Sequence, residues 1–458
     1  MGIHSVERTA IPASGPDVRP GQFHLPAGWP VLAVLVLFPL WYVLGLGAFI
    51  WIILAVPMLV HLVVAKTWRV PRGFIIWVFF LIWVALSAIE ISKSTNWLTY
   101  AYRAGGYLAA TVAFIYLVNT GEKALPTRRI INALTVLWVV IVIGGFAAMA
   151  APHLSFPTPT EKLLGHLGSN KLLLALIHPT LAQAQALGGV QAIGHAIARP
   201  AAPFAYTNWW GANFAFLVPF VILAIRQART RLVRVSLAAT MLASLVPFIY
   251  SINRGAWLSL IIGGLYAWVR FAARRRGRAA LGGLALLAVL AVAVFATPLG
   301  SVVRARVGHE GSASLRLSLI QQSGQNVLGS PVVGYGVPLP PPVSQYSLPN
   351  VGTQGQLWLV LVSVGIPGTV FFLLWLLYVF WSSRSADDPV SFAVHVAILI
   401  TLPQLPFYGW MPTEMFLIMV AAALVWRDRD QSVLAQPVLA QPALDSGFLP
   451  APSPSARR

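Results

Sequence analysis

The sequence predicts an all-α integral membrane protein with about twelve transmembrane helices and two long extracytoplasmic loops. Of its 458 residues, 58% are hydrophobic and only 9% are charged, whereas soluble globular proteins carry about 25% charged residues. Apolar stretches of about 18 or more residues recur along the chain, and each is long enough to cross a hydrocarbon core. The chain has no cysteine, so neither disulfides nor thiolate metal sites are expected.

Hydropathy places twelve spans, with boundaries uncertain by about 2–4 residues. They cover residues 30–44, 46–65, 73–91, 98–118, 130–151, 207–225, 233–250, 255–271, 279–297, 356–381, 390–408 and 411–426. Together they form a membrane domain over residues 29–430. Residues 1–28 are polar, rich in Pro and Gly, and lack the layout of a cleaved signal peptide, which predicts a disordered cytoplasmic leader. Residues 431–458 repeat "VLAQP" and predict a disordered cytoplasmic tail.

Two connections between the spans are long, at about 153–205 and 298–352. Connections of this length in compact proteins are usually functional or disordered. The first contains "KLLLALIHPTLAQAQAL", an apolar-faced stretch suited to lying at the membrane surface. The second begins with "SASLRLSLIQQSGQNV", which predicts a short helix. Gly334, Gly336 and a run of prolines follow, and they predict a rigid irregular loop.

The distribution of positive charge predicts the orientation. The formal net charge of +19 follows topology and does not indicate nucleic-acid binding. With the N-terminus inside, inner segments hold 22 of the 31 Lys and Arg residues. Such an excess on the cytoplasmic side is the positive-inside rule, so both termini are expected in the cytoplasm. The nine outer cations are Lys93, Arg103, Lys162, Lys171, Arg199, Arg254, Arg304, Arg306 and Arg316.

Few carboxylates offset these outer cations, which favours an anion site. The guanidinium fork matches phosphate oxygens in two places at once. Arg254, in "SINRGAWLSLIIGG", opens an apolar span from the outer side. The alternative for Arg254 is snorkelling to lipid headgroups, which is common near helix ends. Arg103 lies inside the fourth span, and Glu90 at the end of the third span is its obvious partner. That pair is either a structural ion pair or part of a polar cavity.

Four short motifs between about residues 199 and 370 resemble the bacterial O-antigen ligase and O-antigen polymerase superfamily. "SINRGAWLSLIIGG" resembles its Ser-Arg-Gly segment, and "RPAAPFAYTNWWGANFAFLVP" resembles the Arg, Phe, Asn segment before it. "SLRLSLIQQSGQNVLGSPVVGYGVP" resembles the family's Arg-Leu helix with a later Pro and Gly-x-Gly. "QGQLWLVLVSVGIPG" resembles the next span. The order and spacing of the four motifs carry the resemblance.

The resemblance implies a metal-independent membrane glycosyltransferase of the plasma (inner) membrane that needs no cofactor. Such an enzyme passes a glycan from undecaprenyl diphosphate, a polyprenyl-diphosphate carrier, to an acceptor hydroxyl on a glycan or lipid at the outer face, in the biosynthesis of cell-surface polysaccharide. Its expected partners are these two substrates and membrane lipids, with no nucleic acid. Arg199 and Arg254 are implied to contact the diphosphate. Arg316 and then Arg103 are the next candidates for substrate binding, and Asn208 and Gln354 are expected to orient the sugar or the acceptor.

The sequence departs from the family at the expected histidine, because counting back from Gly365 places Gln354 there. Glutamine cannot act as a general base, so His309 and Glu310 in "GHEG" become the candidates for that role. The other outer candidates are Glu90, Glu161, Glu414, His153, His166, His178 and His195. Tyr335 is a candidate for stacking on sugar, whereas Trp209 and Trp210 fit the aromatic belt of a membrane surface.

The chemistry is also consistent with the residues themselves. A diphosphate leaves readily once its developing charge is neutralised, and preorganised arginines can do this at a shielded site. The outer loops contain no Asp, so no acidic metal signature stands there. Two alternatives stay open: a transporter for an anionic envelope precursor, and a non-catalytic family member. Many transporters are built from internal repeats, which this sequence does not show.

Overall fold

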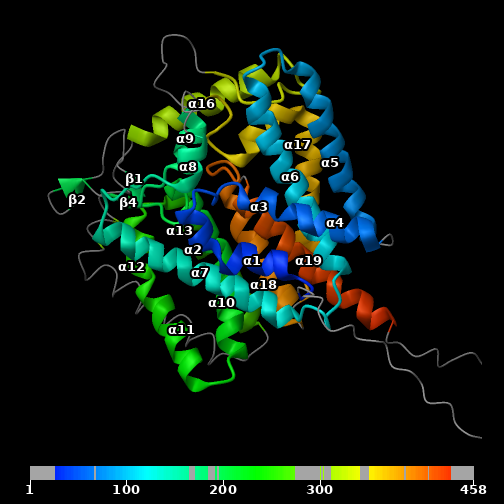
Figure 1. The fold of residues 1–458 in the computed structure, drawn as a ribbon, viewed down its shortest axis with the longest axis vertical. Coiled ribbons are helices and arrows are strands. Elements are labelled where there is room, and N and C mark those ends of the chain that lie inside the picture. The colour runs from blue at the N-terminus through cyan, green and yellow to red at the C-terminus, as the bar shows by residue number, and fades with distance from the viewer. Residues whose placement is uncertain are drawn as a thin grey trace, which may run out of the picture.

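A computed structural model gives the fold (Figure 1). It describes residues 26–65, 69–164, 171–183, 191–192, 195–196, 198–273, 300, 303, 311–340, 350–385, 388–410 and 412–434. Most of the predicted leader and tail, the predicted span 279–297, and the candidate bases His309 and Glu310 lie outside these residues.

Helices form nearly all of the described structure. They are α1 (Trp29–Val36), α2 (Phe38–Val43), α3 (Ile50–Ile53), α4 (Ala55–Ala65), α5 (Ile75–Leu86), α6 (Asn96–Asn119), α7 (Thr127–Ala150), α8 (Pro159–Leu164), α9 (Lys171–Ile177), α10 (Thr207–Gln227), α11 (Arg231–Ala243), α12 (Leu245–Tyr250), α13 (Arg254–Ala272), α16 (Gly311–Val327), α17 (Gln356–Ser382), α18 (Pro389–Thr401) and α19 (Thr413–Leu434). Short 3₁₀ turns are η1 (Arg72–Phe74), η2 (Ser87–Glu90) and η5 (Leu402–Gln404).

Among the described residues, seven helical stretches are long and apolar enough to cross a membrane. They are Arg72–Glu90, Asn96–Asn119, Thr127–Ala150, Thr207–Gln227, Arg231–Tyr250, Arg254–Ala272 and Gln356–Ser382. This confirms the prediction of an all-α membrane protein, while the total of twelve spans stays a prediction. Two further apolar stretches, Ile50–Ala65 and Pro389–Gln404, are shorter.

The predicted span 30–44 is divided into α1 and α2 rather than forming one helix. The break falls at Leu37, whose φ of −89° and ψ of 17° end the first helix. Pro39 follows two residues later and lacks a backbone N–H, so it cannot continue the hydrogen-bond ladder of α1. The hydrophobicity of the segment therefore does not predict the length of its helices.

Helix α19 lies in the middle of the bundle. Every residue from Thr413 to Arg427 is buried, and the helix packs against α6, α10 and α18. A helix that is apolar on all sides is expected at the centre of a bundle. Aromatic rings pack it against its neighbours. The ring centroid of Trp426 lies 5.7 Å from that of Phe114 in α6, and the centroid of Phe416 lies 5.1 Å from that of Trp51 in α3.

The bundle has two ends, called here the loop end and the tail end. The loop end carries α8, α9, α16 and two short strand pairs, and the tail end carries the last turns of α19 (Figure 1). At the loop end, Thr160 donates its backbone N–H to the Leu44 carbonyl at 3.2 Å. At the tail end, Arg427 of α19 is 3% exposed and donates to the carbonyls of Gly121 and Leu125.

The long loops fold over the loop end. Strand β1 (Ala182–Gln183) pairs antiparallel with β4 (Arg199–Pro200), with Gln183 opposite Arg199, and β2 (Gln191–Ala192) pairs with β3 (His195–Ala196). Helix α16 confirms the short helix predicted in the second loop, and Gly334 and Gly336 have the positive φ values of 75° and 70° typical of an irregular glycine loop.

The second loop also fills a break in α17. Gly365 interrupts this helix with φ 78° and ψ −177°, a conformation that only glycine adopts readily. The loop satisfies the backbone groups that the break frees: Tyr335 donates its N–H to the Val362 carbonyl at 3.0 Å, and Ile366 donates to the Pro331 carbonyl at 2.8 Å. Non-helical backbone at this depth is tolerated because protein covers it.

Candidate anion site at the loop end

Residues 251–254 form a turn between α12 and α13 at the loop end. Ser251, Ile252 and Asn253 are each at most 1% exposed. Ile252 has a φ of 52°, which is rare for a β-branched residue and strained by about 1–3 kcal/mol. Strain of this kind persists only where the surroundings impose it, and it is common at functional sites.

Asn253 ties the turn to its neighbours. Its Oδ1 accepts a hydrogen bond from the Tyr408 hydroxyl, and its Nδ2 donates to the Thr207 carbonyl at 3.4 Å. Two glycines make room for these partners, because a Cβ at Gly211 would meet Asn253 and a Cβ at Gly255 would meet the Tyr408 ring. Asn253 precedes α13 but does not cap that helix with its side chain.

Arg199 is held on the same turn. Its Nε donates to the Ser251 carbonyl at 2.7 Å, and its Nη2 lies 3.4 Å from Oδ1 of Asn208. Strand β4 supplies Arg199, and the first turn of α10 supplies Asn208. The structure therefore brings together Arg199, Asn208 and the turn that leads into Arg254.

Arg254 is the first residue of α13 and is half-buried. Among the described residues, its guanidinium has no hydrogen-bond or carboxylate partner. A cation at this position opposes the helix macrodipole by about 0.3–1 kcal/mol. The first-turn amides of α13 also lack a side-chain cap. An anion at this place would be bound by the helix N-terminus and by the guanidinium together.

The wall beside Arg199 is made of neutral hydrogen-bonding groups. Gln183 of β1 accepts from the Thr207 backbone N–H at 3.1 Å and donates from Nε2 to the Ala205 carbonyl at 2.9 Å. Burial raises the pKa of the neighbouring Tyr206 phenol above its usual value, so this hydroxyl stays protonated. Here the local positive charge comes from the two arginines.

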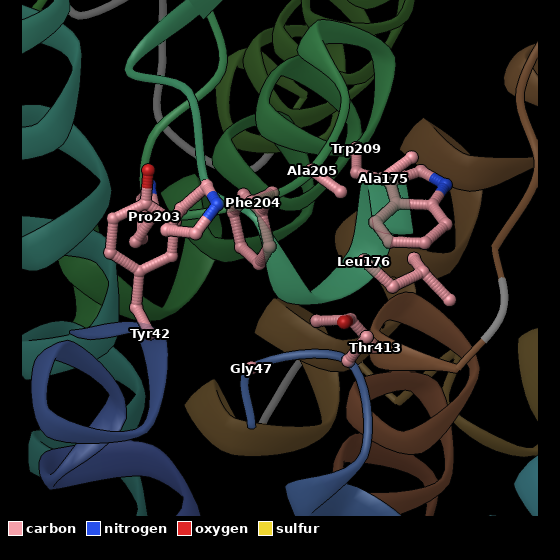
Figure 2. Close-up of a pocket in the computed structure, with 11 residues that line it drawn as sticks. Tyr42, Gly47, Ala175, Leu176, Pro203, Phe204, Ala205, Trp209 and Thr413 are labelled. Atoms are coloured by element: carbon pink, nitrogen blue, oxygen red, sulfur yellow. The ribbon is translucent and has the colours of Figure 1, made fainter. Parts of the chain in front are cut away.

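A small pocket opens next to this wall (Figure 2). It is small and partly open to solvent. Its lining comes from the α2–α3 turn, from α9, from the segment before α10 and from the starts of α10 and α19. Tyr42, Phe204 and Trp209 supply aromatic surface, and Thr413 supplies a hydroxyl. Trp209 directly follows Asn208, so the pocket borders the Arg199 site.

The predicted pair of Arg103 with Glu90 is wrong. Glu90 ends η2 and is exposed, whereas Arg103 lies within α6 with its Nη1 buried and unpartnered among the described residues. The neighbouring phenols of Arg103 are used elsewhere: Tyr102 donates to the Ala48 carbonyl at 3.3 Å, and the Tyr107 hydroxyl accepts from Gln356 at 2.9 Å.

Two other predicted site residues are used to dock α16. Gln354 donates from Nε2 to the Leu319 carbonyl at 3.0 Å and to the Ser323 hydroxyl at 2.7 Å. Tyr335 donates its hydroxyl to the Asn326 carbonyl at 3.0 Å. These bonds give both side chains a structural task in this conformation. Arg316 lies on the same helix, but its side chain, like His309 and Glu310, is outside the described part.

The aromatic pair Trp209 and Trp210 does not form a simple membrane belt. Trp210 is fully buried and donates to the Ile141 carbonyl at 3.0 Å, whereas Trp209 is half-buried and lines the pocket. In the described part of the chain, no group of three or more His, Asp or Glu residues is placed to hold a metal ion.

Comparison with known proteins returned no match to any family model and none to a curated protein. The resemblance to O-antigen ligases therefore stays a prediction carried by the four motifs. Two of those motifs are in contact at the turn of residues 251–254, where Arg199 donates to the Ser251 carbonyl.

Sequence reasoning missed the residues that build the site. Asn253 stands inside the quoted motif, but its pairing with Tyr408 joins residues 155 positions apart and has no local pattern. Asn213 was also missed, whereas Glu414 was among the outer candidates for a base. Glu414 had a weak signal, since it is a carboxylate in an otherwise apolar stretch, and such residues are functional candidates by default.

Proposed function

We propose that this protein transfers a glycan from a polyprenyl-diphosphate carrier to an acceptor hydroxyl at the membrane surface of its loop end. The observation that carries the proposal is the turn of residues 251–254. It places Arg254 at an uncapped helix N-terminus and fastens Arg199 to the same backbone. Both features suit a multiply charged phosphate ligand.

The chemistry required of the protein is modest. When the bond between the anomeric carbon and the diphosphate breaks, negative charge grows on the leaving oxygen. Arg254, Arg199 and the first amides of α13 would neutralise that charge from fixed positions, which is the most effective form of electrostatic catalysis. The strained turn at Ile252 is consistent with a site whose geometry is imposed before the substrate binds.

A transporter of an anionic envelope precursor is the second candidate, and one observation favours it. Helix α17 is broken at Gly365, and broken helices form substrate sites in many transporters. At this break, however, the chain's own loop bonds the freed groups at Val362 and Ile366. An occupied break supports a structural role, and the arginines lie at a different element, so transfer is the better reading. A non-catalytic role is the third candidate, since Gln354 cannot replace a histidine base.

The decisive experiment uses the purified full chain reconstituted in lipid nanodiscs, with a polyprenyl-diphosphate-linked glycan as donor. We expect the wild-type chain to transfer the glycan, and we expect the transfer rate of Arg199→Ala to be at least 100-fold lower. Arg229→Ala is the matched control, because Arg229 is an exposed arginine at the tail end. Movement of labelled donor into proteoliposomes without any transfer product would instead establish the transporter.

A further inference from the structure

The side chain of Asn253 stands where a helix is normally capped, but it bonds elsewhere. Asn253 is the N-cap residue of α13, and its side chain makes no hydrogen bond to the amides of that helix. Asparagine is among the best capping residues, because its side-chain oxygen accepts from the second or third amide of a helix. Here that oxygen accepts instead from the Tyr408 hydroxyl. A tertiary contact therefore overrides the local preference of the sequence.

The first amides of α13 consequently stay open. The N–H groups of Arg254, Gly255 and Ala256 have no hydrogen-bond acceptor in the described part of the chain. The first amides of any helix stay unpaired unless a side chain, water or a ligand accepts from them. In α13 they belong to the same turn as the half-buried guanidinium of Arg254. This turn therefore keeps its full capacity to bind an anion.

The backbone of Tyr408 is fixed by the beginning of α17. Gln356, the first residue of that helix, donates its N–H to the Tyr408 carbonyl at 2.7 Å. The Gln356 side chain also accepts from the Trp410 N–H at 3.0 Å. Tyr408 is 2% exposed, and its phenol lies against α13, where a Cβ at Gly255 would meet it. The first amide of α17 thus has an acceptor in the segment whose tyrosine keeps α13 uncapped.

We propose that Tyr408 is a positioning residue of the anion site: it holds the Asn253 side chain away from the first turn of α13 and so leaves the amides of that turn available to the diphosphate. This inference rests on the proposed function, in which those amides and Arg254 bind the donor. Tyr408 acts through Asn253 rather than on the ligand. The turn forgoes the stability of a capped helix, and the positive φ of Ile252 adds strain at the same place.

Removing the Tyr408 hydroxyl should redirect the Asn253 side chain. In Tyr408→Phe, the Asn253 oxygen loses its donor while the residue is only 1% exposed, and an unpaired buried oxygen is unfavourable. The donors that the N-cap position offers are the amides of Gly255 and Ala256. The side chain is expected to cap α13 and to occupy the amides that an anion would use. Competition from such a cap weakens anion binding by about tenfold.

Binding is tested with inorganic pyrophosphate on the full chain in nanodiscs of zwitterionic lipid, where no anionic headgroup competes. Tyr408→Phe should raise the dissociation constant for pyrophosphate about tenfold, as worked out above. Tyr116→Phe is the matched control. It removes a phenol hydroxyl that accepts from the buried Gly28 N–H at 2.9 Å, next to Leu125 of the tail end. This control should bind pyrophosphate as the wild-type chain does.

A second substitution separates a positioning role from a merely structural one. Adding Asn253→Ala to Tyr408→Phe removes the side chain that would cap α13, so the double variant should bind pyrophosphate at least threefold more tightly than Tyr408→Phe alone. If Tyr408 only supported the fold, the second change would weaken binding further, because both substitutions remove contacts of one buried turn. The melting temperature of Tyr408→Phe should also fall less than that of Tyr116→Phe, because a new cap replaces the lost bond.

The outcomes separate this inference from the proposed function. Pyrophosphate binding by Tyr408→Phe within threefold of wild type, or a double variant that regains no affinity, overturns the role of Tyr408 whatever the rate of glycan transfer. A wild-type chain that binds no pyrophosphate overturns it as well. If pyrophosphate binding depends on Tyr408 and Asn253 as expected but no glycan is transferred from any polyprenyl-diphosphate donor, the proposed function fails and the positioning role stands.

Discussion

Removing the guanidinium of Arg254 is expected to weaken donor binding strongly without weakening the fold. The side chain begins α13, is half-buried, and has no hydrogen-bond partner among the described residues. A guanidinium that grips a phosphate makes charge-assisted hydrogen bonds worth about 1.5–3 kcal/mol each. Discounted for partial exposure, the loss on Arg254→Ala is about 3 kcal/mol, which is a fall in affinity of roughly 100-fold.

The thermal stability of the Arg254→Ala chain should not fall, although its affinity for the donor does. A positive charge at the first position of a helix opposes the macrodipole by about 0.3–1 kcal/mol, and no internal bond to Arg254 is lost among the described residues. Arg254→Ala should therefore melt at the same temperature as the wild-type chain or slightly above it. Arg254→Lys keeps a point charge without the fork, so its affinity should fall by about tenfold.

The assay is direct binding of a polyprenyl diphosphate to the nanodisc-reconstituted chain, with the melting temperature of each variant measured in parallel. Arg229→Ala is the control, since it removes an exposed arginine from the tail end. An Arg254→Ala chain that binds the diphosphate within threefold of wild type refutes the anion site. A large fall in its melting temperature refutes the view that Arg254 is kept for function at the expense of stability.

Three further substitutions test the architecture that carries the site. Gly365→Ala should lower stability by at least about 2 kcal/mol, because φ is 78° and a Cβ would lie 2.6 Å from the Val332 carbonyl oxygen. In the control Gly264→Ala of α13, the new Cβ would meet nothing within 4 Å, so this change should be neutral or slightly stabilising. Thermal unfolding in detergent compares the two variants. Gln354→Ala should cost about 1–2 kcal/mol and loosen α16, which limited proteolysis within that helix reports. Arg427→Met should cost about 1–3 kcal/mol, because the carbonyl of the buried Leu125 loses the guanidinium that donates to it, and a melting temperature equal to wild type would contradict this.

Much of the candidate site could be predicted from sequence because its parts are local. "SINRGAW" places an arginine at the beginning of an apolar span, and the scarcity of outer cations marks Arg254 and Arg199 as unusual. The expectation that these two arginines share a site comes from the resemblance of the motifs to O-antigen ligases, which stays a prediction. By contrast, the pairing of Arg103 with Glu90 was inferred from closeness along the chain, and in the structure Glu90 is exposed while Nη1 of Arg103 is buried without a partner among the described residues.

The sequence by itself determined the helical membrane class, and it predicted twelve spans and two long loops; seven described helices are long and apolar enough to cross a membrane. These follow from composition and hydropathy, which act residue by residue and need no knowledge of partners. Only the tertiary structure decided that Gln354 docks α16, that Asn253 joins Tyr408, and that Glu414 and Asn213 are buried with oxygens that have no partner among the described residues. Those facts depend on which helices pack together, because the free-energy cost of burying a polar atom depends on whether the neighbouring helix offers it a hydrogen-bond partner. No single stretch of sequence contains that neighbour.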